Sequence, residues 1–385
     1  MEFTQGNSGP ATGSPSLGAG DRFQSVATLL EAAIAQRAFP GAVFGVLHRG
    51  LVLALHAVGR FTFADDSPAV TTETPYDLAS VSKVVATTAM TMLLWQRGSL
   101  TLDTLLGDVL PGFVIGADDS IGKRRLVTLR TLLTHSSGLP AYAPFFETCA
   151  TSDEVLRAAL SMPLAAQPGT VAAYSDLGFI LLGKALEVLA GESLDRFCER
   201  EIFAPLGMLA TRYGPLDPAR VPPTEENTAF RKRVVAGEVH DENCFVMGGV
   251  CGHAGLFAPA MDVLRFADAM LQPLRTNEAN TLLSAETVRL FTRRADLPPG
   301  SSRALGWDTP SGAPSSSGRY FSASSFGHLG YTGTSLWIDP VEDVAVVLLT
   351  NRTFPTRENR KIQEVRPAFH DAVTELLPGG ASTRK

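Results

Sequence analysis

A serine and a lysine three positions apart form the first pattern in the sequence that could carry chemistry. Ser80-Val81-Ser82-Lys83 precedes a segment that is apolar on nearly every face, which is typical of a buried helix. Three positions span about one helical turn, so the hydroxyl of Ser80 and the amine of Lys83 are expected on the same side. A buried ammonium is costly unless it is paired or its pKa falls. A lysine of lowered pKa can take the proton of a serine and make it a nucleophile.

The same motif has a plainer interpretation, and it also occurs elsewhere in the chain. Ser80 can be a helix cap, and Lys83 a surface side chain whose stem lies on apolar residues. The Ser-x-x-Lys at 120–123 lies in a charged loop and the one at 382–385 in a polar tail, and no apolar helix follows either. The context therefore favours Ser80 as the nucleophile. The start of its helix would add a partial positive charge and a free N–H that could hold an oxyanion.

Two further segments carry groups that suit a hydrolytic site. Tyr174 stands between a loop and a predicted helix, where its hydroxyl could face a cleft and a nearby ammonium would lower its pKa. Its plainer interpretation is a half-buried core tyrosine. The glycine-rich segment 327–334, which includes His328 and Gly330, precedes a predicted strand. On an edge strand it could supply an oxyanion N–H and allow close approach of a ligand, whereas a glycine-rich bulge would have no such role.

Composition narrows the classes of protein to which such a site could belong. Of the 385 residues, 45% are apolar and 19% charged, and the net charge is −6. This balance indicates a soluble globular protein and disfavours electrostatic binding to nucleic acid. The sequence contains none of the common cofactor motifs, and the group His240, Asp241, Glu242 and His253 matches no metal-ligand spacing. We therefore expect neither a cofactor nor a metal.

No segment predicts a membrane span or a secretory signal. The longest apolar stretch, 84–95, is shorter than the ~18 residues that a span requires. The N-terminus lacks the basic start and the apolar core of a signal peptide. We expect a cytoplasmic protein, or a periplasmic or secreted one if a signal has been removed. The four cysteines form no compact framework, which favours free, buried thiols in a reducing compartment.

The apolar periodicity predicts the elements that position these residues. Residues 1–20 are rich in Gly, Ser, Pro and Ala and are expected to form a disordered tail. Strands are predicted at 42–47, 51–58, 304–308, 333–339 and 344–350, and helices at 21–37 (capped by Asp21), 84–96, 177–189, 261–271 and 362–377. This order predicts an α+β fold, an α/β sandwich with an antiparallel sheet from both ends of the chain (21–75 and 300–385), flanked by helices. An all-helical domain (within 76–299) is inserted in it.

Taken together and in this order, these residues resemble the serine β-lactamase and penicillin-binding-protein-like superfamily, in particular class C β-lactamases and their esterase relatives. In that family a Ser-x-x-Lys opens a buried helix, a Tyr-x-Asn follows, and a Lys-Thr-Gly lies on an edge strand. Linking phrases at 77–79, 133–140, 205–208 and 252–257 are also similar. The resemblance runs from about residue 22 to the C-terminus and implies a β-lactamase/transpeptidase-like fold.

The resemblance also implies a role for each catalytic group. Ser80 is the nucleophile that becomes acylated, and Lys83 and Tyr174 share the transfer of its proton to the leaving group. Tyr174 then activates water for deacylation. The oxyanion hole consists of the backbone N–H groups of Ser80 and Tyr331, and each such donor typically contributes about 3 kcal/mol.

Two positions depart from the family pattern and bear on the substrate. Asp176 stands where the family has asparagine, and His328 where it has the lysine of Lys-Thr-Gly. An ionised Asp176 cannot donate a hydrogen bond to a substrate amide, and a neutral His328 attracts a carboxylate less than lysine does. Both changes weaken recognition of an anionic lactam more than that of a small neutral ester. Asp176 could instead pair with Lys83 and keep it charged, which would move the base function to Tyr174.

The sequence therefore favours a serine carboxylesterase that acts on small or medium acyl esters through an acyl-enzyme. A β-lactamase or D-amino-acid peptidase with the same machinery is the alternative, and a penicillin-binding sensor that is acylated without turnover is a third hypothesis. The expected partner is a small ester or lactam, and the oligomeric state is open. The residues expected to contact the substrate are Asp176, His328, Gly330, Phe145, Phe245 and His253.

Overall fold

The computed structural model of the chain describes residues 22–115, 121–276, 282–312 and 315–378. The predicted tail at 1–20 lies outside the described residues, as does Asp21, the predicted cap of the first helix. Ser120 and Ser382, which begin the two other Ser-x-x-Lys motifs, also lie outside them.

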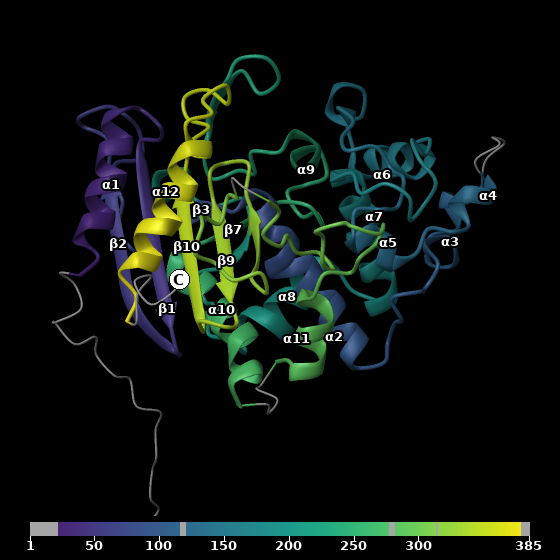
Figure 1. Cartoon of the computed structure of the whole chain (residues 1–385). Helices are drawn as coiled ribbons and strands as arrows, with labels where there is room; N and C mark the ends of the chain where they lie inside the picture. The colour runs from purple at the N-terminus through teal and green to yellow at the C-terminus, as the bar shows by residue number, and fades with distance from the viewer. Residues whose placement is uncertain (1–21, 116–120, 277–281, 313–314, 379–385) are drawn as a thin grey trace, which may run out of the picture.

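The centre of the fold is an antiparallel sheet formed by both ends of the chain. Its five strands have the order β2-β1-β10-β9-β8, so that β1 (Gly41–His48) pairs with β10 (Val344–Thr350). The others are β2 (Leu51–Gly59), β9 (Ser335–Asp339) and β8 (Phe326–Leu329). Figure 1 shows purple N-terminal strands beside yellow-green C-terminal ones. The prediction of a sheet built from the two termini is confirmed.

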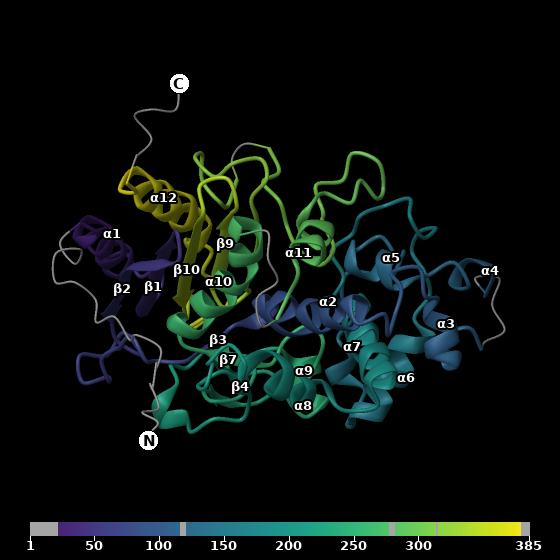
Figure 2. The ribbon, with the colours of Figure 1, turned by 90° about the horizontal axis from the view of Figure 1, so that it is seen from below.

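The side chains of β10 show why the sheet is covered on both faces. Even-numbered residues from 344 to 348 pack in one apolar cluster with α1 (Gln24–Ala35) and α12 (Ile362–Glu375). Odd-numbered residues from 345 to 349 belong to a second cluster that includes α10 (Ala260–Thr276). Figure 2 shows α1 and α12 on one side of the strands and α10 on the other. A continuous apolar run is what a strand buried on both faces requires, because successive side chains point to opposite faces.

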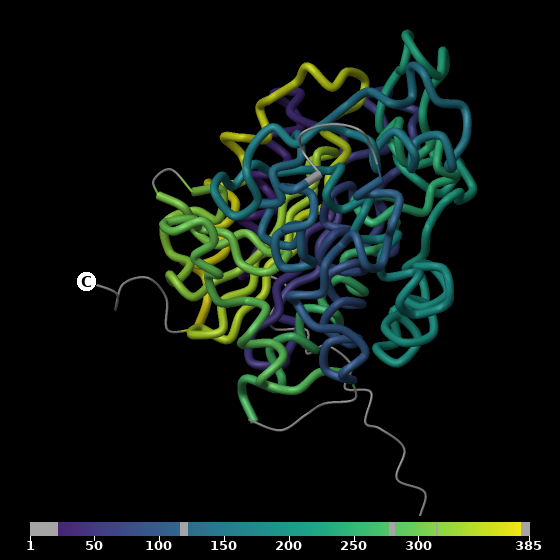
Figure 3. Tube along the Cα trace, turned by 90° about the vertical axis from the view of Figure 1, so that its right-hand side faces the viewer, coloured from purple at the N-terminus to yellow at the C-terminus, as the bar shows by residue number. Residues whose placement is uncertain are grey.

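The described residues between β2 and β8, apart from α10, form a mainly helical part beside the sheet, drawn in blue to green in Figure 3. Its helices are α2 (Ala89–Gln96), α3 (Leu106–Val109), α4 (Ile121–Arg124), α5 (Leu129–Leu133), α6 (Ser152–Ser161), α7 (Asp176–Ala190), α8 (Leu194–Cys198), α9 (Glu242–Val246) and α11 (Ala285–Thr292). Two short sheets lie here as well, β3-β7-β4 and β5-β6. Their strands are β3 (Tyr76–Asp77), β4 (Arg212–Tyr213), β5 (Glu225–Asn227), β6 (Arg233–Val235) and β7 (Leu256–Ala258). The sequence had predicted an all-helical inserted part, and the two short sheets show that this part is only mainly helical.

Several elements differ from their predicted form. Residues 304–308 form no strand and contribute only a bridge between Asp308 and Gly327, because Gly306 has a φ of +84° and interrupts the extended backbone. Strand β8 was not predicted as an element, since a four-residue segment containing a glycine shows too little alternation. The predicted helix 84–96 consists of a π-helical turn, Lys83–Thr88, followed by α2.

None of the helices in the described ranges has the length and apolar character needed to cross a membrane. No three His, Cys, Asp or Glu side chains gather as a set of metal ligands in the same ranges. All four cysteines are free; Cys149 is partly exposed, and Cys198, Cys244 and Cys251 are buried.

Phe369 tests the packing of α12 on the sheet. Its buried ring lies edge-on to Phe44 of β1, with ring centroids 5.7 Å apart. Phe369→Ala is expected to lower the free energy of unfolding by about 3–5 kcal/mol because a cavity remains, as measured by urea denaturation. Leu51→Ala, at a side chain that is 67% exposed, is the control and should change it by less than about 0.5 kcal/mol. Equal effects of the two substitutions would contradict this account of the packing.

Candidate active site

The turn that follows β3 brings Ser80 and Lys83 together, as their spacing predicted. A 3-10 turn, Ala79–Val81, leads directly into the π-helical turn that begins at Lys83. The Nζ atom of Lys83 lies 3.0 Å from the Oγ atom of Ser80. Lys83 is completely buried, so its surface-exposed interpretation is wrong. π-Helical turns of this kind often occur at functional sites.

Every proton of the Lys83 ammonium has an acceptor. Besides Ser80, Nζ donates to Oδ1 of Asp176 at 2.7 Å and to the carbonyl oxygen of His253 at 3.0 Å. Burial by itself lowers the pKa of Lys83, but the charge of Asp176, with a contribution from Tyr174, outweighs burial and raises this pKa. Lys83 is therefore an ammonium in the resting protein. The expectation of a lysine with lowered pKa is wrong, and the alternative in which Asp176 keeps Lys83 charged agrees with the structure.

Tyr174 lies beside the same ammonium, at the loop that precedes α7. The Nζ atom of Lys83 is 4.9 Å from the centroid of its ring, and the guanidinium carbon of Arg303 is 5.4 Å from it. Burial raises the pKa of Tyr174, and the charge of Lys83 and the hydrogen bonds with Lys83 and Ser80 lower it only in part. The phenol therefore keeps its proton at neutral pH. The expected fall of this pKa near an ammonium does not occur, because burial dominates.

The loop that carries Ser80 is held by hydrogen bonds on both sides. Oδ1 of Asp77 accepts the N–H of Ala79 at 2.8 Å, and Ala79 has a φ of +47°, a conformation that a residue with a side chain rarely adopts. The hydroxyl groups of Thr332 and Thr334 donate to the carbonyl oxygens of Asp77 and Leu78 at 2.8 and 2.9 Å. The segment after β8 is thereby joined to the backbone just before the serine.

Gly330 allows this close approach. A Cβ atom at Gly330 would collide with Oγ1 of Thr334 and with the carbonyl oxygen of Leu78. Gly330 also lies on the wall of a cavity at Ser80. Glycine is therefore required at position 330 for a steric reason, because two backbone segments are in contact there.

Two cavities meet at Ser80. Ser80, Tyr174, Tyr331 and Arg357 line both of them. The first cavity, of about 370 Å³, extends along β8 and the start of α12. The second, of about 400 Å³, extends along the loops that carry residues 141–142, 240–242 and 253–254. Ser80 therefore has open space on two sides, enough for the two parts of a substrate that would flank a reacting carbonyl.

The wall of the first cavity is positively charged. Its lining includes Arg352, Arg357, Arg360 and Arg366, and among the described residues Asp308 is the only carboxylate there. This cluster of arginines was not predicted from the sequence. The signal that could have found it is the concentration of basic residues between the last strand and the final helix.

Two of these arginines are fixed by backbone carbonyls next to Ser80. Arg352 donates to the carbonyl oxygen of Tyr331 at 2.7 Å. Arg366 donates to the carbonyl oxygens of Gly330 and Thr334 at 2.7 and 2.9 Å. Burial and the charge of Arg352 lower the pKa of Arg366 to about 9. Because carbonyl oxygens neutralise no charge, both guanidinium groups retain a positive field toward the cavity.

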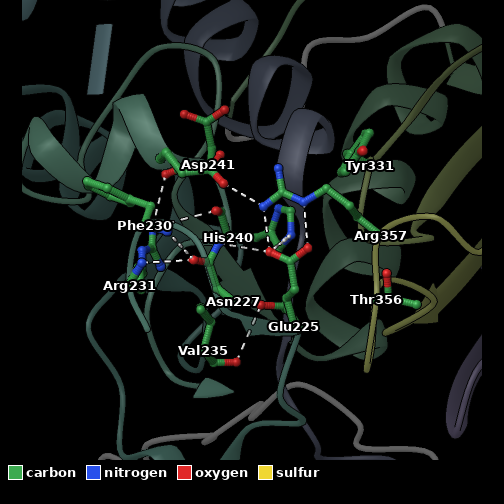
Figure 4. Close-up of polar contacts among 12 residues, drawn as sticks. Glu225, Asn227, Phe230, Arg231, Val235, His240, Asp241, Tyr331, Thr356 and Arg357 are labelled. Atoms are coloured by element: carbon green, nitrogen blue, oxygen red, sulfur yellow. Dashed lines mark hydrogen bonds and ion pairs between the residues drawn. The ribbon is translucent and has the colours of Figure 1, made fainter. Parts of the chain in front are cut away.

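Charged side chains of both signs line the second cavity. Nε2 of His253 lies 2.8 Å from Oδ1 of Asp241. Burial lowers the pKa of His253, but Asp241 more than offsets burial and raises it to about 10. In Figure 4, Arg357 reaches toward Glu225, and it also forms an ion pair with Glu242. His253, one of the predicted substrate residues, and the neighbouring residues 240–242 are thus part of the cavity wall.

The other predicted substrate residues divide into two groups. His328 lines the first cavity, and burial, together with Lys83 and Arg303, lowers its pKa to about 3, so that it is neutral. Phe145 and Phe245 line neither cavity. Phe145 is buried in the main apolar cluster, and Phe245 packs on the guanidinium of Arg231, 4.0 Å from its ring centroid. The structure therefore does not support an apolar acyl pocket made from these two side chains.

A comparison with protein families matches the description Beta-lactamase to residues 26–368, most of the chain. The protein belongs to the β-lactamase family. This agrees with the resemblance found from the sequence and with the sheet and mainly helical part described above. The family assignment makes the protein a serine hydrolase of the β-lactamase type.

Relatives of this β-lactamase family member carry names of several activities. It is 35% identical over 307 residues to an Escherichia coli O157:H7 protein named "Putative D-alanyl-D-alanine carboxypeptidase", covering 73% of this chain and 70% of that protein. It is 34% identical over 345 residues to the N-acetylmuramyl-L-alanine amidase of Bacillus subtilis, covering 82% and 77%.

Solved structures with the same fold include EstCE1, a hydrolase with promiscuous acyltransferase activity. Its TM-score is 0.70 at 23% identity, covering 90% of this chain and 98% of that one. The penicillin-binding protein homologue from Pyrococcus abyssi has a TM-score of 0.69 at 20% identity, covering 89% and 75%. At this level of identity the likeness shows the β-lactamase/transpeptidase-like fold alone.

Gly330→Ala tests the contact between the segment after β8 and the loop of Ser80. The added Cβ has to displace the backbone beside Ser80, and a shift of about 1 Å in such a site can reduce the rate about 100-fold. We expect a loss of this size in kcat/KM for p-nitrophenyl acetate. Gly122→Ala, where a Cβ meets nothing within 4 Å, is the control and should leave kcat/KM unchanged. Wild-type activity of a folded Gly330→Ala protein would contradict the steric argument.

Proposed function

We propose that the protein is a serine amidase or peptidase that cleaves an amide bond whose leaving group carries a carboxylate. The observation that carries this proposal is the arginine-lined cavity beside Ser80. Guanidinium groups bind carboxylates through paired, charge-assisted hydrogen bonds. The substrate class that we infer is a short peptide fragment that releases alanine or an alanine-containing peptide.

The names of the two relatives described above, each more than 30% identical to this chain, support this class. D-Alanyl-D-alanine carboxypeptidase and N-acetylmuramyl-L-alanine amidase each denote hydrolysis of an amide bond to the nitrogen of alanine. The alanine released by the first reaction carries a carboxylate close to the bond that breaks, and the alanine released by the second does so when the substrate ends at that alanine. A cationic cavity next to the nucleophile suits that common feature.

The arginines also change the argument for a neutral ester. That argument rested on His328, which is neutral where the family has a lysine. Arg352 and Arg366, held at the adjoining backbone carbonyls, supply positive charge that His328 does not. A carboxylesterase remains a second candidate, because an ionised Asp176 offers no N–H to the amide group of an acylamino substrate. Both candidates use the same nucleophile.

In this proposal the proton of Ser80 moves through the pair formed by Lys83 and Tyr174. Loss of one proton from the pair produces the reactive form, with Lys83 as ammonium and Tyr174 as phenolate. Ser80 attacks the carbonyl carbon and gives its proton to the phenolate. Tyr174 then protonates the leaving nitrogen as the C–N bond breaks. In deacylation it takes a proton from the water that attacks the acyl carbon and gives that proton to Ser80 as the ester bond breaks.

The remaining groups stabilise charge. The backbone N–H groups of Ser80 and Tyr331, residues that line both cavities, are proposed to hold the oxyanion. The Lys83 ammonium stays next to Ser80 and Tyr174 throughout, where it stabilises the phenolate. Asp176, 2.7 Å from Nζ, keeps that ammonium charged.

The first test compares substrates. We expect wild-type protein to hydrolyse N-acetylmuramyl-L-alanine or N-acetyl-D-alanyl-D-alanine with a higher kcat/KM than the corresponding C-terminal amides, and Ser80→Ala to lose all turnover. Release of alanine can be followed by an amino acid assay. A kcat/KM for p-nitrophenyl butyrate that exceeds both peptide values by orders of magnitude, with no preference for the free carboxylate, would favour the esterase instead.

The second test removes one charge from the first cavity. Arg360 lines this cavity and is exposed, so Arg360→Ala removes a cation with little effect on folding. We expect KM for the carboxylate substrate to rise about tenfold or more, since hydrogen bonds to charged groups contribute about 1.5–3 kcal/mol, while KM for the C-terminal amide stays the same. Arg293→Ala, at an exposed arginine that lines neither cavity, is the control. Equal effects on both substrates would contradict a carboxylate site.

The third test uses the pH dependence of the rate. Asp176 raises the pKa of Lys83 and that of Tyr174, and the reactive form requires loss of one proton from this pair. The kcat/KM should therefore rise with pH and level off above the pKa of the pair. Asp176→Asn lowers this pKa, so the rising limb should move to lower pH. Asp66→Asn, an exposed control, should leave the limb in place; a limb that stays in place in Asp176→Asn would contradict the assignment.

A further inference from the structure

His135 binds the backbone on both sides of Tyr174. The N–H of Ala173 donates to the carbonyl oxygen of His135 at 2.8 Å, and the N–H of Ser175 donates to its Nδ1 atom at 3.0 Å. The imidazole also lies against the phenol ring, with centroids 4.6 Å apart, and against Phe179 at 5.0 Å. One residue thus determines both the path of the backbone at Tyr174 and the surface on which its ring rests.

The segment that begins at His135 continues to hold the residues around Tyr174. The carbonyl oxygen of Ser136 accepts the N–H of Gly169 at 2.7 Å, and that of Ala141 accepts the N–H of Asp176 at 2.9 Å. His135 itself has a φ of +55°, a conformation that is uncommon for residues other than glycine, although histidine adopts it more often than most side chains do. Strained backbone of this kind persists where surrounding contacts determine it and is concentrated at functional sites.

The ring of His135 has to be neutral to do this. Nδ1 accepts a hydrogen bond from a backbone N–H, so the ring proton is on Nε2. Burial, followed by the charges of Arg303 and Lys83 and the proximity of His328, lowers the pKa of His135 well below its ordinary value, and only the bond from Ser175 opposes this. Burial and the nearby cations therefore keep Nδ1 unprotonated, so that it can accept the hydrogen bond from the N–H of Ser175.

His135 packs on Tyr174 but lies outside the two cavities at Ser80. It lines neither cavity, and its acceptor nitrogen is occupied by a backbone N–H. A buried histidine near a serine nucleophile would ordinarily be considered as a general base, but Nδ1 of His135 already accepts the N–H of Ser175.

We propose that His135 is a positioning residue that holds the phenol of Tyr174 at Ser80. The inference rests on the proposed proton transfer through Tyr174 and extends it to a residue that contacts neither substrate nor nucleophile. The acceptor at Nδ1, and not only the bulk of the ring, carries this role.

Two substitutions separate the acceptor from the ring. His135→Asn places an amide oxygen where Nδ1 lies and tolerates the positive φ, but it loses the ring. His135→Phe keeps a ring against Tyr174 and loses the acceptor. The control is His56→Phe, in the edge strand β2, where the imidazole stacks on Phe44 with centroids 5.1 Å apart.

The measured quantity is the rate at which a fluorophosphonate labels Ser80, as a function of pH. This probe reports the activated serine whatever the natural substrate is, so its result is independent of whether peptides are cleaved. We expect His135→Phe to be labelled at least tenfold more slowly, with its pH limb displaced from that of the wild type because Tyr174 no longer rests beside Lys83. His135→Asn should stay within about threefold of wild type with an unchanged limb, as should His56→Phe.

Thermal unfolding establishes that each variant is folded before it is labelled. A folded His135→Phe protein with the wild-type rate and limb would overturn the proposal. A folded His135→Asn protein that is slowed more than tenfold would also overturn it, and this holds even if His135→Phe does not fold. Lack of peptide hydrolysis by the wild type, with normal labelling, would count against the proposed substrate and leave the role of His135 to be decided by the variants.

Discussion

The buried ion pair between Lys83 and Asp176 is the interaction on which the rest of the site depends. Its Nζ–Oδ1 distance is 2.7 Å, and Lys83 has no exposed surface. A lone ammonium in this position would cost several kcal/mol, so the turn that carries Ser80 can occupy the interior only if α7 presents its first residue to it. The ion pair therefore joins two parts of the chain that are 93 positions apart, and it places the nucleophile and the loop of Tyr174 against each other.

Features that depend on neighbouring residues could be predicted from the sequence, and most of those that depend on contacts between distant segments could not. The sheet strands β1, β2 and β10 and the proximity of Ser80 and Lys83 were predicted because apolar runs and one helical turn are local signals. The position of Tyr174 beside them was expected only from the resemblance to the family. The arginines were missed, because Arg352 and Arg366 acquire their role only through carbonyl oxygens of a segment on another element. Phe145 and Phe245 were misjudged for the converse reason: an aromatic residue in a loop has the same sequence signal whether it faces a cavity or packs in the interior.

The two departures from the family pattern have different consequences in three dimensions. Asp176 does not weaken the site; its negative charge is matched by the Lys83 ammonium. His328 leaves the edge strand without a cation. The positive charge is supplied instead by arginines from the C-terminal segment that line the same cavity. Arg357 differs from the others, because Glu225 and Glu242 already pair with it. It connects the C-terminal segment with Glu225 (Figure 4) and Glu242, and it lines both cavities.

The same cations also determine which groups can transfer protons. Lys83 and Arg303 lower the pKa values of His135 and His328 after burial has already done so, and both imidazoles are therefore neutral over the physiological range. Asp241 has the opposite effect on His253 and keeps it protonated. Among the described groups around Ser80, Lys83 and Tyr174 form the pair that contacts the hydroxyl, and because their pKa values are raised, the pair loses a proton only at alkaline pH. The histidines around Ser80 therefore hold the backbone or carry a fixed charge. Proton transfer is left to the phenol of Tyr174.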